Sequence, residues 1–234
     1  FLWSVVPGIL VILLTRLIKE RPRITNHKPP TTNIKPQTAN IFAFISYWKQ
    51  SSSEYKRLVT GLLLFALFNS SDVFLLLKMK ETGLNDTEIL GIYIFYNLIY
   101  AIIAYPVGIM ADKLGLKKIF LLGLAAFVTV YTGFAFTNNL VVFISLFALY
   151  GFYAAATDGI SKAWITNIAD KSDTATAIGT YTGFQSIAAL IASSLCGLLW
   201  YNFGAMATFL ITASVTGFVI IYLFFQKRSA AGIS

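Results

Sequence analysis

Seven long apolar segments constrain this chain more than any other feature of its sequence. A helix needs about 20 mostly apolar residues to cross the hydrocarbon core of a bilayer. Segments close to that length lie at residues 1–17, 58–77, 89–111, 119–136, 140–160, 175–200 and 204–225. Hydrophobic residues make up 57% of the chain and charged residues 12%, a composition that belongs to a membrane protein and not to a water-soluble one. The sequence predicts an all-α membrane protein.

The connectors between the last six segments are short, and they predict how the helices follow one another. Turns such as residues 137–139 and 201–204 leave room only for antiparallel neighbours. Each span should be a helix, because the backbone has no water to bind inside a bilayer. We therefore expect a polytopic helical bundle, with six compact spans and one additional transmembrane helix before them.

The basic residues predict the orientation of this bundle. The chain has 18 Lys and Arg against 10 Asp and Glu, a net charge of +8. Nine basic residues lie in the connector at 16–57, three in the loop at 113–118, one in the loop at 170–173 and two directly after the last span, at 227 and 228, all on one side of the bundle. The opposite side carries only Lys78 and Lys80. By the positive-inside rule the first side is cytoplasmic, and nucleic acid is not needed to explain the charge.

The connector differs in composition from the spans. Four prolines lie in it, the first at Pro22 and the last at Pro36, with Thr, Asn and Lys between them. This composition predicts a flexible linker. Near its end, residues 41–48 hold Phe42, Phe44 and Trp48. This stretch could form a short amphipathic helix on the membrane surface or an apolar lead-in to the next span, and both interpretations stay open.

Few residues are available for catalysis or metal binding. Cys196 is the single cysteine, and His27, the single histidine, has no other His or Cys near it. We expect no disulfide, zinc site or cofactor. We also expect no enzyme, because the sequence offers no set of residues typical of a catalytic site. The chain begins at Phe1, already inside an apolar segment, so we expect that an N-terminal part of the protein is missing.

A loop motif leaves the segment at 89–111. From Gly108 to Lys118 the chain reads GIMADKLGLKK. This resembles the G-x-x-x-D-[RK]-x-G-[RK]-[RK] loop signature of major facilitator superfamily (MFS) transporters, with Leu116 where the family prefers a base. Its place between the second and third of the six compact spans also agrees with that family. The matching residues are Gly108, Asp112, Lys113, Gly115, Lys117 and Lys118.

The resemblance implies a division of the chain. Residues 1–19 would be the last transmembrane helix of an N-terminal half and residues 20–57 the cytoplasmic linker. Residues 58–228 would be the C-terminal six-helix half, and residues 229–234 a cytoplasmic tail. Residues 69–77, 149–153 and 158–163 are also similar to stretches in a bacterial branch of the family. In such a transporter the loop motif would act as a gate latch.

Asp72 and Asp158 lie inside predicted spans and Lys162 lies just past the end of one, so these three charges need a reason, since a charge inside the bilayer costs about 2.5 to 3.5 kcal/mol on insertion scales. Asp72 lies about 21 Å along its helix from Leu58, at about 1.5 Å per residue, in the outer half of the bilayer. It could bind protons, hold a cationic substrate or sit among outer headgroups. Asp158 and Lys162 are four residues apart on one helix and could pair. They could close a latch with the loop motif, couple protons or substrate, or form a structural pair that reaches the interface.

Polar and aromatic residues in the spans are candidates for a substrate cavity. The candidates at 93, 96, 97 and 100 form one stripe at helical spacing. This stripe is expected to form part of the cavity wall, although interhelical hydrogen bonding would explain the same pattern. The candidates are Asn69, Tyr93, Tyr96, Asn97, Tyr100, Tyr150, Tyr153 and Gln185.

These observations predict a secondary active transporter in the cytoplasmic (inner) membrane that moves a small solute by alternating access. Proton-coupled export of a small organic compound is the favoured version, with Asp72 or Asp158 as the coupling residue. The expected partners are the solute, protons, the lipid bilayer and the missing N-terminal half of the same chain. The alternatives are a proton-coupled nutrient symporter and a non-transporting scaffold or receptor.

Overall fold

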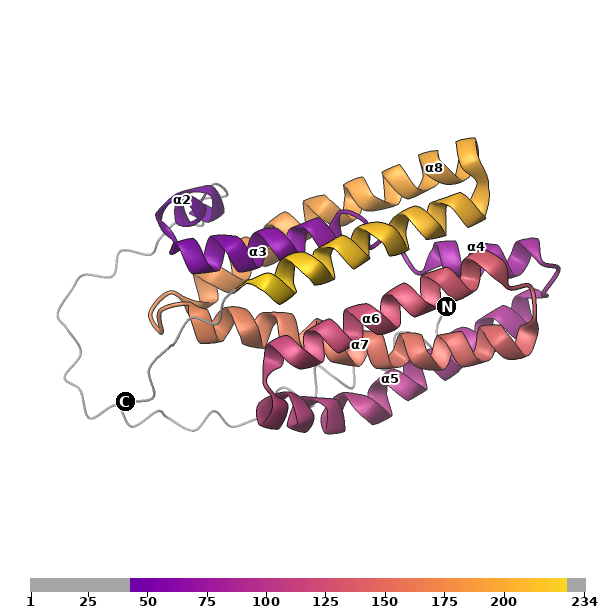
Figure 1. Ribbon diagram of the computed structural model, residues 1–234, viewed down its shortest axis with the longest axis horizontal. Helices are drawn as coiled ribbons and strands as arrows, with labels where there is room; N and C mark the ends of the chain where they lie inside the picture. Colours follow the sequence, from indigo (N-terminus) through magenta and orange to yellow (C-terminus); the bar gives the residue numbers. More distant parts are fainter. Residues whose placement is uncertain (1–42, 227–234) are drawn as a thin grey trace, which may run out of the picture. The chain divides into compact units, whose positions relative to one another are not determined.

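The computed structural model describes residues 43–226, which contain seven helical segments and no strand (Figure 1). The predicted span at 1–17, most of the linker with His27, and the tail lie outside the described residues. The helices are α2 (Ala43–Gln50), α3 (Ser53–Ala66), α4 (Val73–Glu81), α5 (Asp86–Leu114), α6 (Leu116–Phe136), α7 (Leu140–Ile168) and α8 (Thr174–Phe225). By length and apolar composition, α5, α6, α7 and α8 could each cross a membrane. The predicted all-α polytopic fold is confirmed.

Glycines with positive φ lie in three turns, and two of these turns, at Gly115 and Gly204, separate long apolar helices. Gly204, with φ 78°, folds the 52 residues of α8 into two antiparallel arms (Figure 1). These arms correspond to the spans predicted at 175–200 and 204–225. Gly115, with φ 98°, separates α5 from α6 within the loop motif. A residue with a Cβ rarely adopts such a backbone conformation, so the structure explains both glycines.

Hydrogen bonds between distant segments group the loops into two ends of the bundle. At what we name the Lys117 end, Lys117 Nζ donates to the carbonyl of Gln226 at 2.6 Å, and Tyr222 donates to the carbonyl of Arg57 at 3.2 Å. At what we name the Lys78 end, Lys78 Nζ donates to Asn138 Oδ1 at 3.1 Å. These contacts agree with helices that alternate in direction.

The segment at 58–77 does not form one continuous helix, so the prediction of a single span there is wrong. Helix α3 ends at Ala66, and α4 begins only at Val73. Between them, the amide of Ser70 donates to the carbonyl of Phe68 at 3.1 Å instead of reaching four residues back. Asn, Ser and Asp side chains compete for backbone hydrogen bonds, which favours a break here. The straight-helix position of Asp72 at about 21 Å from Leu58 therefore does not hold.

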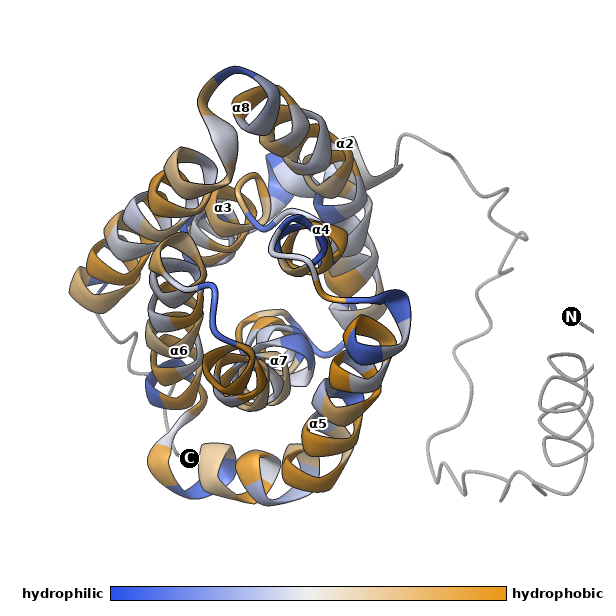
Figure 2. Ribbon diagram, turned by 90° about the vertical axis from the view of Figure 1, so that its right-hand side faces the viewer, coloured by the Kyte–Doolittle hydropathy of each residue, from blue (hydrophilic) through white to orange (hydrophobic). Residues whose placement is uncertain are grey.

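Helix α7 lies between α5, α6 and α8 (Figure 2). Small residues bring α6 and α7 close together, since a Cβ on Gly123 would lie 2.8 Å from the Cβ of Ala156. The outer side of α5 instead exposes large apolar side chains, among them Leu90, Ile94 and Ile102. An exposed apolar stripe of this kind fits contact with lipid.

Helix α2 shows that part of the stretch at 41–48 is helical. Trp48 packs its ring against Phe184 at 5.6 Å, and Tyr47 packs against Tyr55 at 5.4 Å. Burial, followed by the negative charges of Asp173 and Asp170, raises the pKa of Tyr47. The aromatic side of α2 therefore packs on the protein, and its position relative to a membrane stays a prediction.

Candidate functional site

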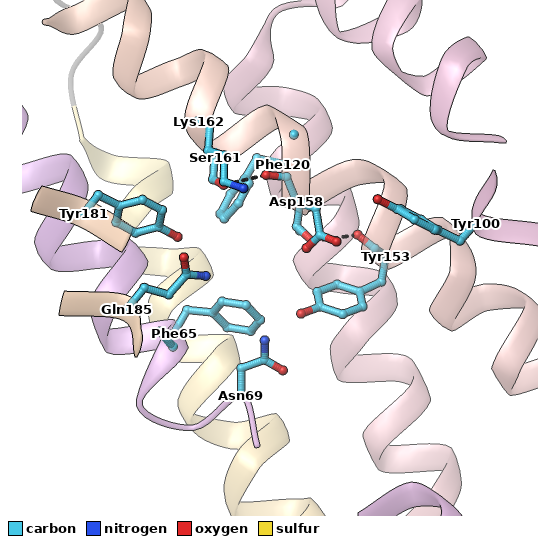
Figure 3. A pocket seen from close by; sticks show the side chains of 13 residues that line it. Phe65, Asn69, Tyr100, Phe120, Tyr153, Asp158, Ser161, Lys162, Tyr181 and Gln185 are labelled. Carbon is cyan, nitrogen blue, oxygen red and sulfur yellow. Dashed lines mark hydrogen bonds between the residues drawn. The ribbon is translucent and has the colours of Figure 1, made fainter. Parts of the chain in front are cut away.

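A polar cavity of about 470 Å³ lies in the helical bundle (Figure 3). It is lined by residues of α3, α5, α6, α7 and α8, together with Asn69 from the α3–α4 break. The lining residues are Phe65, Ala66, Asn69, Tyr100, Phe120, Tyr153, Thr157, Asp158, Gly159, Ser161, Lys162, Tyr181 and Gln185. This size is within the usual range for small-molecule pockets.

Helical spacing brings the charged residues of α7 to the cavity. Ser161 and Lys162 follow Asp158 by three and four residues, so one face of α7 presents the three side chains together. Ser161 donates its hydroxyl to the backbone carbonyl of Asp158 at 3.1 Å, so that hydrogen bond does not engage the carboxylate. The sequence analysis did not select Ser161, although its position between the two charges could have indicated it.

The charges of Asp158 and Lys162 remain open to the cavity. Both residues are exposed, and Lys162 and Tyr100 are among the groups that act electrostatically on the Asp158 carboxylate. Within residues 43–226, the ion pair that forms joins Lys80 to Asp86 at the other end of the bundle. The predicted partners of the i, i+4 pair thus share a cavity wall without closing an ion pair.

The opposite wall carries amide and hydroxyl groups. Figure 3 shows Asn69, Gln185 and Tyr181 turned toward the same space as Tyr153 and Asp158. Asn69 Oδ1 is buried and has no hydrogen-bond partner in the described structure. A buried acceptor without a donor costs free energy, so a rotation of this amide that exposes the oxygen to the cavity would be favoured by a donor there.

The predicted cavity residues divide into two groups. Asn69, Tyr100, Tyr153 and Gln185 line the cavity. The remaining four, which do not line it, are Tyr93, Tyr96, Asn97 and Tyr150.

Tertiary packing explains why that second group lies outside the cavity. The rings of Tyr96 and Tyr150 pack 5.1 Å apart, and Tyr93 packs against Tyr96 at 5.6 Å. Asn97 donates to the carbonyl of Tyr93 on its own helix at 2.8 Å. The stripe expected as one wall therefore forms an aromatic cluster and reaches the cavity only through Tyr100.

Asp72 lies outside the cavity lining and has partners within the protein. The Tyr150 hydroxyl donates to Asp72 Oδ1 at 2.6 Å, linking the α3–α4 break to α7. Tyr93 also interacts with the Asp72 carboxylate. Asp72 is half-buried, and a carboxylate that accepts such a short bond is held in place.

The loop motif borders a second cavity, of about 310 Å³, between α5, α6 and α7. Gly108 and Asp112 line it, and Tyr100 and Gly159 line both cavities. Lys113 and Lys118 are exposed. Lys117 donates to the carbonyls of Phe224 and Gln226, at 3.1 and 2.6 Å, and so ties the loop to the end of α8. Lysine at a helix C-terminus also interacts favourably with the helix dipole.

Comparison with known proteins assigns a family to this arrangement. Residues 57–233 match the family model of the Major Facilitator Superfamily. The chain belongs to the major facilitator superfamily. It is also 30% identical, over 184 residues, to an uncharacterized MFS-type transporter of Methanocaldococcus jannaschii. The alignment covers 75% of this chain and 46% of that relative, so the chain spans about half of the relative's length.

Membership of the major facilitator superfamily places the chain in a family of multi-pass membrane transporters rather than in a family of enzymes. The apolar helices α5 to α8 agree with a lipid environment.

Proposed function

We propose that this MFS chain forms part of a secondary active transporter that exports a small organic solute, coupled to protons, by alternating access. The observation that carries the proposal is the polar cavity, where Asp158 and Lys162 face the same space and, among residues 43–226, close no ion pair. A charge inside a membrane is costly and is usually retained for function. The aromatic side chains around the two charges favour an organic solute over an inorganic ion.

The domain division supports a transporter that is completed by a further half. In our proposal residues 58–228 form the C-terminal six-helix half, and residues 20–57 form the linker from an N-terminal half. The cavity would then face that N-terminal half, and rocking of the two halves would open it to either side. The linker, the Lys117 end and the tail would be cytoplasmic in the cell membrane, since they carry most of the basic residues.

Two carboxylates are candidates for proton coupling. Asp158 faces the cavity directly, whereas Asp72 is bound to Tyr150 at 2.6 Å. Tyr150 and Tyr153 pack at 5.0 Å, and Tyr153 lines the cavity. Occupancy of the cavity could thus alter the surroundings of Asp72 through one turn of α7. We favour Asp72 as the proton site and Asp158 as a solute contact.

The loop motif would serve as the latch of the cytoplasmic gate. Asp112 borders the cavity that also contains Gly159, the neighbour of Asp158. In the described conformation Lys117 is bound to the end of α8. A second conformation could exchange this contact for one with Asp158 while Lys162 meets Asp112, as charge networks at two-state interfaces do.

The test uses the full-length protein in proteoliposomes with an imposed proton gradient and an internal pH dye. Amphipathic and polar solutes are added to wild type, Asp72→Asn and the exposed loop control Asp170→Asn. We expect solute-dependent proton flux in wild type and in the control, and its loss in Asp72→Asn. Flux that survives in Asp72→Asn would transfer the coupling role to Asp158. Solute movement without any proton flux would contradict proton coupling and retain transport.

A further inference from the structure

We propose that the cavity selects a small zwitterionic solute, whose ammonium group binds Asp158 and whose carboxylate binds Lys162. This inference rests on the proposed transport function and adds the chemical class of its substrate.

The first step is the state of the two charges. Side chains four residues apart on a helix have Cβ atoms about 5 to 6 Å apart, close enough for Asp and Lys to pair. In this structure both side chains are exposed to the cavity, and the described residues form their ion pair elsewhere, between Lys80 and Asp86. Asp158 and Lys162 therefore each keep an open position toward the same space.

The second step is that the neighbouring hydroxyl groups of α7 do not fill these positions. Ser161 donates to the Asp158 backbone carbonyl, and Thr157 donates to the carbonyl of Tyr153 at 2.9 Å. Both hydroxyls are thus used along their own helix. Tyr100 of α5 acts on one part of the Asp158 carboxylate. A carboxylate has about four acceptor positions and an ammonium three donors, so Asp158 and Lys162 still have groups to offer to a molecule that enters between them.

The third step compares the possible charges of that molecule. A simple amine would satisfy Asp158 and leave Lys162 without a counter-charge in a desolvated site, and a simple acid would do the reverse. Leaving one charge unpaired on binding is unfavourable. A solute with both groups satisfies both residues, so the site discriminates against each singly charged analogue.

The rest of the cavity suits the remainder of such a solute. The rings of Phe65, Phe120 and Tyr153 offer apolar surface, and an aromatic face attracts an ammonium group. Asn69 and Gln185 add amide groups to the same wall, with the Asn69 amide nitrogen turned toward the cavity (Figure 3). A volume of about 470 Å³ accommodates a solute of amino-acid or dipeptide size.

The experiment uses sets of three probes that share one side chain. Phenylalanine, phenethylamine and 3-phenylpropionate form one set, and the corresponding leucine and glutamine sets extend it. Each probe is tested for binding to the full-length detergent-solubilised protein by thermal shift, and for uptake into proteoliposomes under an imposed gradient. We expect the zwitterion of at least one set to bind and move at least tenfold better than its amine and acid.

Single variants then give opposite changes of selectivity. Lys162→Gln should lower the preference for the zwitterion over the amine at least tenfold, because the carboxylate loses its partner. Asp158→Asn should lower the preference for the zwitterion over the acid by a similar factor. Lys171→Gln and Asp170→Asn, exposed in the α7–α8 loop, are the matched controls and should keep the wild-type preferences.

The outcomes separate this inference from the proposed function. Transport of amines or acids, but of no zwitterion, would overturn the zwitterion inference and keep the transporter. Equal loss of all probes in both variants would also overturn it, because the two charges would then not distinguish the ammonium from the carboxylate of the solute. If no probe of any charge moves under any gradient, the proposed transport function fails together with the inference.

Discussion

Asp72 and Asp158 are both carboxylates inside the helical bundle, and the structure surrounds them in opposite ways. Asp72 lies at a break between two helices and accepts a hydrogen bond of 2.6 Å from Tyr150. Asp158 lies in the middle of the continuous helix α7, is exposed, and faces a cavity that Lys162 shares. Tyr150 holds the first charge with a short hydrogen bond, whereas Tyr100 and Lys162 act on the second, which also faces the open cavity.

The difference predicts that the contacts of Asp72 contribute to stability as well as to coupling, whereas Asp158 contributes to solute transport alone. Removing a partner from a held group leaves an unsatisfied charge in the folded protein, which lowers the free energy of unfolding. Changing a group that faces an open cavity removes a contact to the solute and disturbs little packing. The following predictions test whether the two carboxylates divide in this way, beginning with the largest effect.

Asp158→Asn should have the largest effect on transport. A hydrogen bond to a charged group contributes about 1.5 to 3 kcal/mol, so we expect solute transport to fall by about 10- to 100-fold. The free energy of unfolding should change by less than about 0.5 kcal/mol, as for other exposed positions. Uptake into proteoliposomes and thermal unfolding in detergent measure the two effects. A large loss of stability with unchanged transport would reverse the roles of the two carboxylates.

Tyr150→Phe should mainly affect stability. The substitution keeps the ring that packs against Tyr96 and Tyr153 but removes the donor to Asp72. Hydrogen bonds between membrane helices contribute about 0.6 kcal/mol on average and up to about 1.7 kcal/mol, and a charged acceptor places this one near the upper value. We expect a loss of about 1 to 2 kcal/mol in the free energy of unfolding.

Tyr153→Phe is the matched control for this measurement. Tyr153 packs in the same aromatic cluster, and its hydroxyl is turned toward the cavity (Figure 3). Its removal should leave the free energy of unfolding within about 0.5 kcal/mol of wild type, because no buried partner is left unsatisfied. Equal losses in the two variants would show that the hydrogen bond to Asp72 has no particular role in stability.

Much of the fold could be predicted from the sequence, because a span in lipid must be apolar and helical. The turns at Gly115 and Gly204 also follow from local sequence. The break after α3 could not be predicted from the sequence in this way, because the high mean hydropathy of the segment at 58–77 outweighs the four polar residues within it. Whether those residues break the helix depends on neighbours such as Tyr150, which are distant in the sequence.

The candidate site was predictable only in part for the same reason. The spacing of Asp158 and Lys162 places them on one face of α7, but spacing does not decide whether an ion pair closes. The residues of the stripe from Tyr93 to Tyr100 share one face of α5. The packing of Tyr96 against Tyr150 nevertheless turns most of them away from the cavity. Helical periodicity indicates which residues share a face, and tertiary packing decides what that face meets.

Ser70→Ala should have the smallest effect. Ser70 lies two residues before Asp72 in the same break and is 5% exposed, but its hydroxyl has no hydrogen-bond partner in the described structure. Removing an unsatisfied buried hydroxyl should change the free energy of unfolding by less than about 0.5 kcal/mol, or raise it.

Asn85→Ala is the comparison for this measurement. It removes a capping box in which the Asn85 side chain accepts from Glu88 N at 3.0 Å, and it should cost about 1 kcal/mol in the same assay. A loss for Ser70→Ala as large as that of Asn85→Ala would mean that the Ser70 hydroxyl binds a neighbour such as Tyr131 or Cys196, and that the whole break, rather than Asp72 alone, is held by hydrogen bonds.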